Sequence, residues 1–168
     1  MKPLHKACCS SLAQVSLVIR SLESHLDKAL YQSSGISRHV RHILDHYLAL
    51  KKGLERNHVN YNHRNREGKV ESDFEFASEI ICYLNNWLAT LKDNDVRLTI
   101  ESEIIIDEQV NAIFESNQDR ELLFMINHTV HHTAYIKLIA LKYDIELPDE
   151  IGIAPSTATY LREEPLSN

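Results

Sequence analysis

The stretch of residues 119–143, DRELLFMINHTVHHTAYIKLIALKY, combines apolar residues at helical spacing with three histidines. Its apolar residues recur every three or four positions, which is the spacing of a helix face. Neither Asp nor Glu occurs between Glu121 and Asp144, so uncompensated positive charge on a histidine would be costly here. We predict a helix over about 118–143 that ends before Asp144 and Pro148.

Three earlier segments show the same apolar period and predict helices over about 10–30, 35–56 and 73–92. Residues 96–115 alternate in β-favouring residues and predict a two-stranded hairpin, whereas 57–69 is polar and predicts a loop. We expect residues 145–168 to form an extended tail packed on the helices. The predicted fold is all-α: a single domain over 1–168 that forms a four-helix up-down bundle, with a small β-hairpin inserted between helices three and four.

Composition narrows the class of protein. Only four Gly and four Pro occur in 168 residues, which argues against a disordered or loop-rich chain. The net charge is −6 and no Lys/Arg block stands out, so we expect no nucleic-acid partner. Three cysteines without a CxxC spacing fit a reducing compartment. With no uncharged stretch of 18 residues and no signal-peptide pattern, we expect a cytoplasmic protein without a membrane partner.

The ten histidines are the unusual feature of the composition. His128 and His132 are four residues apart in the predicted fourth helix, so they project from one face and form a chelating pair. His131 points away from that face. Histidine pairs of this kind suggest a bound metal ion.

The predicted second helix contains His39, His42 and His46 along one flank of its apolar stripe. One of them would complete a three-histidine site with His128 and His132, but spacing alone does not decide which. Three imidazoles suit a divalent transition ion such as Zn, Ni, Cu or Fe and leave a coordination position for water or substrate.

The segments GISRHVRHILDHYLAL (35–50) and RELLFMINHTVHHTAYIKLIAL (120–141) together resemble the DinB-like superfamily of bacterial metal-dependent four-helix-bundle proteins. The resemblance implies that His42, His128 and His132 are the metal ligands, and the helix spacing leaves His46 as the alternative to His42. It implies little effect of replacing His39 or His131. The loop YNHRNRE with the following acidic residue resembles one subgroup at Tyr61, Arg64, Arg66 and Glu71.

The superfamily includes bacillithiol- and mycothiol-dependent transferases, so the resemblance implies activation of a thiol or of water and the chemistry of an S-transferase or hydrolase. The substrate would be a small molecule. Arg64 and Arg66 could bind it if it is anionic, although these arginines can equally form ion pairs with nearby glutamates. Asp45 and Tyr47 are the candidates for orienting an imidazole. The alternative is a non-catalytic, metal-binding or stress-related interaction bundle. In either case we expect a homodimer.

Overall fold

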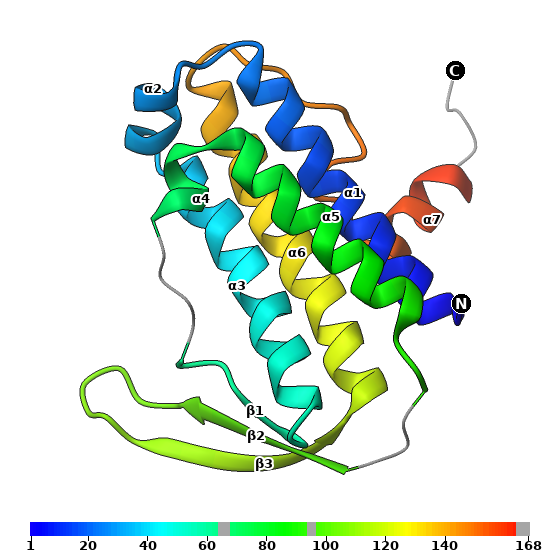
Figure 1. The fold of residues 1–168 in the computed structure, drawn as a ribbon. Coiled ribbons are helices and arrows are strands. Elements are labelled where there is room, and N and C mark those ends of the chain that lie inside the picture. Colours follow the sequence, from blue (N-terminus) through cyan, green and yellow to red (C-terminus); the bar gives the residue numbers. More distant parts are fainter. Residues whose placement is uncertain (64–67, 94–96, 164–168) are drawn as a thin grey trace.

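Four long helices lie side by side in the computed structural model, which describes residues 1–63, 68–93 and 97–163 (Figure 1). They are α1 (Pro3–Glu23), α3 (Ile36–Leu54), α5 (Phe74–Thr90) and α6 (Gln118–Leu141). Helix α1 packs against α5 and α6, and α3 packs against α6. Three shorter helices complete the helical part: α2 (Lys28–Ser33), α4 (Lys69–Ser72) and α7 (Pro155–Glu163).

A three-stranded sheet crosses one end of the long helices, where α3 ends and α6 begins (Figure 1). Its strands are β1 (His58–Asn60), β2 (Arg97–Glu103) and β3 (Asn111–Asn117), in the order β1-β2-β3. Strand β1 pairs parallel to β2, and β3 pairs antiparallel to it, with Ile100 opposite Phe114. Leu98 and Ile100 are buried while Arg97 and Thr99 are exposed, so one face of β2 is turned toward the helices.

The expected simple four-helix bundle with one hairpin is therefore wrong, because the described chain contains seven helices and a three-stranded mixed sheet. The loop predicted over 57–69 contains β1, whose hydrogen bonds go to a strand some forty residues later in the chain. Such a short strand has no detectable period of its own. The four long helices do occupy the regions of apolar periodicity, and β2 and β3 form the hairpin.

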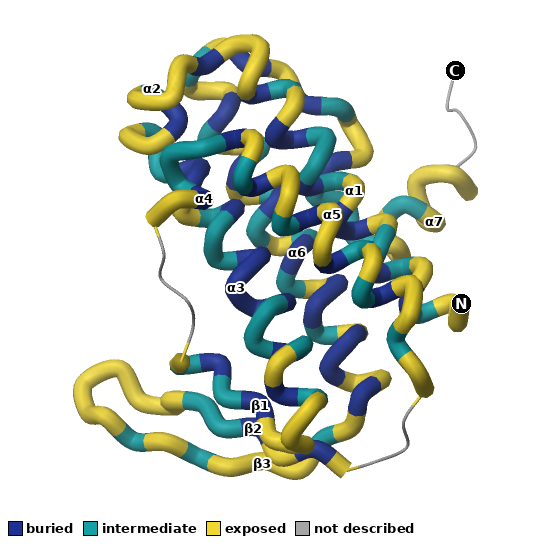
Figure 2. Tube along the Cα trace, in the orientation of Figure 1, coloured by how far each residue is buried: buried dark blue, intermediate teal, exposed yellow. Residues whose placement is uncertain are grey.

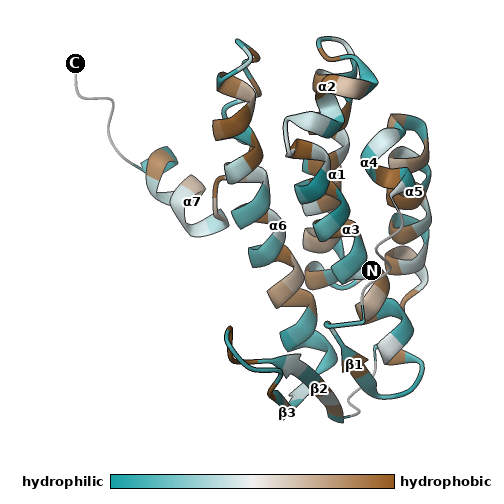
Figure 3. Cartoon of the chain, turned by 90° about the vertical axis from the view of Figure 1, so that its left-hand side faces the viewer, coloured by the Kyte–Doolittle hydropathy of each residue, from teal (hydrophilic) through white to brown (hydrophobic). Residues whose placement is uncertain are grey.

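The C-terminal region also differs from the extended tail expected over 145–168. Ile145, Leu147 and Ile151 are buried against the helices, and the chain then forms α7. This helix has no buried residue and lies beside α6, outside the four packed helices (Figure 3). A helix that buries no residue needs no apolar stripe. The sequence pattern therefore did not predict α7.

Buried residues lie on the facing sides of the long helices and continue to the sheet, while the tip of the hairpin is exposed (Figure 2). Gly53 allows the sheet to come this close to α3. A Cβ atom at Gly53 would lie 2.6 Å from Cγ2 of Val59 and 2.8 Å from the carbonyl oxygen of His58. The missing side chain thus lets β1 pack directly on the last turn of α3.

Within the described residues, no helix has the combination of length and hydrophobicity that crossing a membrane requires.

Candidate metal centre

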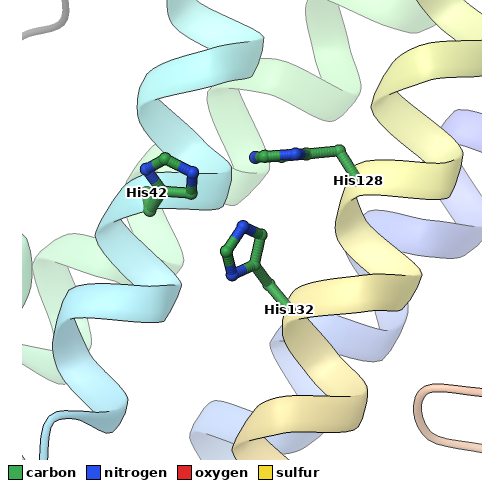
Figure 4. A group of neighbouring side chains, drawn as sticks. All are labelled: His42, His128 and His132. Carbon is green, nitrogen blue, oxygen red and sulfur yellow. The ribbon is translucent and has the colours of Figure 1, made fainter. Parts of the chain in front are cut away.

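Helices α3 and α6 bring three histidines together (Figure 4). His42 comes from α3, and His128 and His132 come from successive turns of α6. One ligand nitrogen from each ring lies within 4.8 Å of those of the other two. The ring centroids are 4.9 Å apart for His42 and His128, and 4.5 Å apart for each of the other two pairs. The set is thus formed by a local pair on one helix and a third ring from its neighbour.

The spacing of these nitrogens is close to what one ion requires. Two nitrogens on a tetrahedral ion with bonds of about 2.1 Å lie about 3.4 Å apart. Starting from separations within 4.8 Å, the rings need to close by no more than about 1.4 Å.

His128 has the character of a metal ligand in its electrostatics as well. Burial first, and then the neighbouring His46, His132 and His42, together lower its pKa to about 2. The ring is therefore neutral at physiological pH. Its Nε2 atom is buried and has no hydrogen-bond partner in the described part of the chain, which is costly for a polar atom. A cation at this point would satisfy it.

A fourth histidine, His39, is hydrogen-bonded to the ring of His132. Its Nδ1 atom is hydrogen-bonded to Nδ1 of His132 at 3.0 Å. This contact engages Nδ1 of His132, so an ion would have to be bound through Nε2. The pKa of His39 is lowered by burial and then by His131, which favours the neutral form. A hydrogen bond to the second nitrogen of a ligand histidine orients the ring and fixes its tautomer.

His46, the sequence alternative to His42, lies directly beside the three ligands. Its ring centroid is 4.3 Å from that of His42 and 4.1 Å from that of His128. The buried ring donates from Nδ1 to the carbonyl oxygen of His42 at 2.8 Å, so its Nε2 carries the lone pair. The set whose ligand atoms are mutually within 4.8 Å nevertheless contains His42 and not His46.

The two candidates for orienting an imidazole are placed on other sides of α3. Tyr47 is completely buried, and its hydroxyl is hydrogen-bonded to the hydroxyl of Ser11 on α1 at 2.8 Å. Burial raises its pKa, so it remains a neutral core residue. Asp45 is paired with Arg41 (3.8 Å) and lines a cavity next to Tyr83 on α5. The structure therefore does not bring Tyr47 to the histidines and directs Asp45 toward α5.

The loop residues singled out by the family resemblance are only partly described. Arg64 and Arg66 lie outside the described residues. Glu71 forms an ion pair with Arg41 of α3. Tyr61 stacks on His46 with ring centroids 5.4 Å apart and donates a hydrogen bond to Glu121 at 2.6 Å.

The sequence interpretation missed Phe124, which extends the site toward the sheet. Its ring centroid lies 5.4 Å from that of His128 and 5.6 Å from that of Tyr61. Phe124 precedes His128 by four residues, so helical spacing alone could have placed it next to this ligand. Its contact with Tyr61 depends on the packing of β1 against α3 and carries no sequence signal.

Comparison with known proteins found one partial sequence similarity and no family match. No family model matches the chain, and no solved structure matches it. The chain is similar to FK506-binding protein 5 of Rhizopus delemar, with 27% identity over 112 residues. The similar region is 63% of this chain and 28% of that protein, so the chain spans less than a third of its relative's length.

Proposed function

We propose that this chain is a metal-dependent enzyme of the DinB-like type, which holds one divalent transition ion through His42, His128 and His132. The observation that carries the proposal is that one nitrogen from each of these three imidazoles lies within 4.8 Å of the others. In addition, Nε2 of His128 is buried and has no hydrogen-bond partner in the described residues. Three protein ligands leave a position on the ion for another molecule, as in catalytic rather than structural sites.

The ion would supply Lewis acidity, which lowers the pKa of a thiol or water bound to it. The residues of the chain keep the ligands neutral and oriented. Burial and the crowding of imidazoles hold His128 in its neutral form, and His39 holds the ring of His132. The carbonyl oxygen of His42 accepts a hydrogen bond from Nδ1 of His46, which places the proton of that ring on Nδ1.

We propose transfer of a thiol sulfur to an electrophilic carbon as the reaction. The thiol gives up its proton, and a sulfur lone pair forms the new carbon–sulfur bond. The bond between that carbon and its leaving group breaks, and the leaving group departs with the electron pair. The proton and the leaving group are released together, so a thiol and an electrophile yield a thioether and an acid.

Metal content and thiol transfer measured on the same preparations test this function. Protein purified without an affinity tag should contain one transition ion per chain, and His42→Ala, His128→Ala and His132→Ala should each remove it. With a panel of low-molecular-weight thiols and a chromogenic aryl halide, metal-loaded protein should form the thioether and His132→Ala should not. His131 is exposed, and His131→Ala is therefore the matched control that should retain both properties.

Three results would contradict parts of the proposal. Equal metal content in wild type and His128→Ala would remove the α6 pair from the site. Loss of the ion in His46→Ala but not in His42→Ala would move the third ligand by one turn. Rates of transfer that are equal in wild type and His132→Ala would exclude metal-activated thiol transfer for those substrates and make water activation the leading chemistry.

A further inference from the structure

A cavity of about 370 Å³ lies between the sheet and the first turns of α6, next to the histidines. Its walls include Ile100 and Phe114 from the sheet, Tyr61 after β1, and Arg120 and Phe124 from α6. Cavities that bind small molecules begin at about 300 Å³ and combine apolar walls with a few placed polar groups. The volume and the lining therefore suit one small molecule.

Two aromatic rings form the boundary between this cavity and the candidate metal centre. Phe124 lines the cavity, and its ring centroid is 5.4 Å from that of His128. Tyr61 also lines the cavity and stacks on His46. A molecule in the cavity would therefore lie one aromatic ring away from a metal ligand, which is within reach of a second substrate bound at the ion.

The sheet presents an uncovered aromatic ring to this cavity. Phe114 lies opposite Ile100 in the register, on the face turned toward the helices, where Ile100 is only 7% exposed. Phe114 is nevertheless 50% exposed. The neighbouring Ile113 belongs to the opposite face because side chains alternate along a strand. A half-exposed phenylalanine beside a cavity with Phe124 and Tyr61 on its walls offers a stacking surface for a planar ligand.

The polar groups of the cavity are organised around Glu121, whose side chain is fully buried. Its carboxylate accepts hydrogen bonds from the hydroxyl of Tyr61 (2.6 Å), the hydroxyl of Ser116 (2.5 Å) and Nη1 of Arg120 (2.9 Å). These bonds fix the positions of both Tyr61 and Arg120. The buried carboxylate is thereby occupied by donors of the protein itself.

Arg120 keeps donors for a ligand. A guanidinium has five N–H donors, and the bond to Glu121 uses one of them. The side chain is 61% exposed, and its guanidinium carbon lies 5.5 Å from the centre of the Phe124 ring. The other carboxylate at the rim, Glu115, is paired with Arg97 at 3.7 Å. A guanidinium can bind a carboxylate, and the aromatic rings beside it can contact the aromatic part of the same ligand.

We propose that this cavity binds the electrophilic co-substrate of the thiol transfer, and that this molecule combines a planar apolar body with a carboxylate. Phe114 and Phe124 would contact the body, and Arg120 would bind the carboxylate. The identification of the ligand as a substrate rests on the proposed function, whereas its binding depends only on the cavity.

Equilibrium binding of 2-naphthoate, followed by its fluorescence, tests the inference without any turnover. Full-length wild-type protein should bind it, with and without metal. Phe114→Ala should weaken binding about three- to tenfold because a stacking partner is lost. Arg120→Gln should weaken the binding of 2-naphthoate about tenfold, because the carboxylate loses its contact with the guanidinium. The affinity for the uncharged 2-(hydroxymethyl)naphthalene should stay the same.

Two matched variants serve as controls. Ile113→Ala removes an apolar side chain from the opposite face of the same strand, and Arg20→Gln removes an exposed arginine of α1. Both should bind 2-naphthoate as the wild type does. Circular dichroism melting of every variant shows whether the fold is intact. If Phe114→Ala unfolds, the comparison of the charged and the uncharged ligand in Arg120→Gln still tests the inference.

The outcomes separate this inference from the proposed function. Absent or weaker-than-millimolar binding by the wild type, or equal affinity in folded Phe114→Ala, would overturn the cavity as the ligand site. An equal loss of both naphthalene ligands in Arg120→Gln would overturn the carboxylate preference. Phe114-dependent and Arg120-dependent binding by a protein that neither retains metal nor transfers thiols would support the cavity and contradict the proposed function alone.

Discussion

The imidazoles of His39 and His132 are hydrogen-bonded through their Nδ1 atoms at 3.0 Å. A residue of α3 thus contacts the nitrogen of His132 that we do not assign to the ion. The family resemblance implied that His39 is dispensable, since it is not one of the three ligands. The contact assigns it a different role, because the partner of a ligand histidine determines which nitrogen faces the ion.

We expect His39→Ala to lower the affinity for the ion about 10- to 100-fold while one ion per chain still binds at saturation. The ring of His132 would lose the contact that orients it but would keep its ligand nitrogen. Competition against a chromophoric chelator measures this affinity. His131→Ala, which removes an exposed neighbour of His132, should have the affinity of the wild type. Unchanged affinity in His39→Ala would show that His132 is oriented by the helix alone.

The stability of the metal-free protein should depend on the protonation of His128. Its pKa is about 2 in the folded chain and 6.5 ordinarily, so between these values the unfolded chain binds the proton and the folded chain does not. The free energy of unfolding therefore rises with pH from about 2 to 6.5, and this contribution is lost on acidification through that window. His128 contributes at most about 1.4 kcal/mol per pH unit and nothing further above pH 6.5.

Urea unfolding at several pH values in the presence of a chelator measures this dependence. His128→Leu should show a smaller slope below pH 6.5 than the wild type, because it removes the group that takes up the proton on unfolding. The two proteins should have parallel profiles above pH 6.5. Identical slopes below that pH would mean that His128 is not held neutral in the folded chain.

Gly53→Ala should destabilise the protein by about 1–3 kcal/mol. Its methyl group would lie 2.6–2.8 Å from atoms of Val59 and His58, including backbone atoms that cannot turn aside. β1 and the attached Tyr61 would have to move away from α3. Gly68→Ala is the matched control, since nothing lies within 4 Å of the added atom there. Equal thermal stability of the two variants would contradict the close packing of β1 on α3.

The expected homodimer stays a prediction, and the exposed apolar side chains near the end of α6 indicate where to test it. Leu138 and Leu141 are 62% and 52% exposed. Burial of such side chains against a second copy would favour association. Light scattering should give about twice 19.4 kDa for the wild type and 19.4 kDa for Leu138→Glu. Ile106→Glu, at the fully exposed hairpin tip, should not alter the mass. A monomeric wild type at micromolar concentration would reject the dimer.

The regions of the long helices and the pairing of His128 with His132 could be read from the sequence, because both depend on local geometry. Apolar residues every three or four positions define a helix face, and residues four apart lie one turn above each other. Neither property requires knowledge of the neighbouring helices. The same reasoning failed for β1, whose partner strand is distant in the chain, and for α7, which buries no residue.

Periodicity did not distinguish His42 from His46; the family resemblance pointed to His42, and the tertiary structure groups His42 with His128 and His132. These histidines are also four residues apart, so they lie on the same face of α3 and periodicity treats them alike. The relative height and rotation of α3 and α6 decide which ring meets the α6 pair, and these follow from packing over the whole core. For the same reason, the His39–His132 contact and the cavity bounded by Tyr61 and Phe124 were absent from the sequence pattern: each joins residues that come together only when separate elements pack.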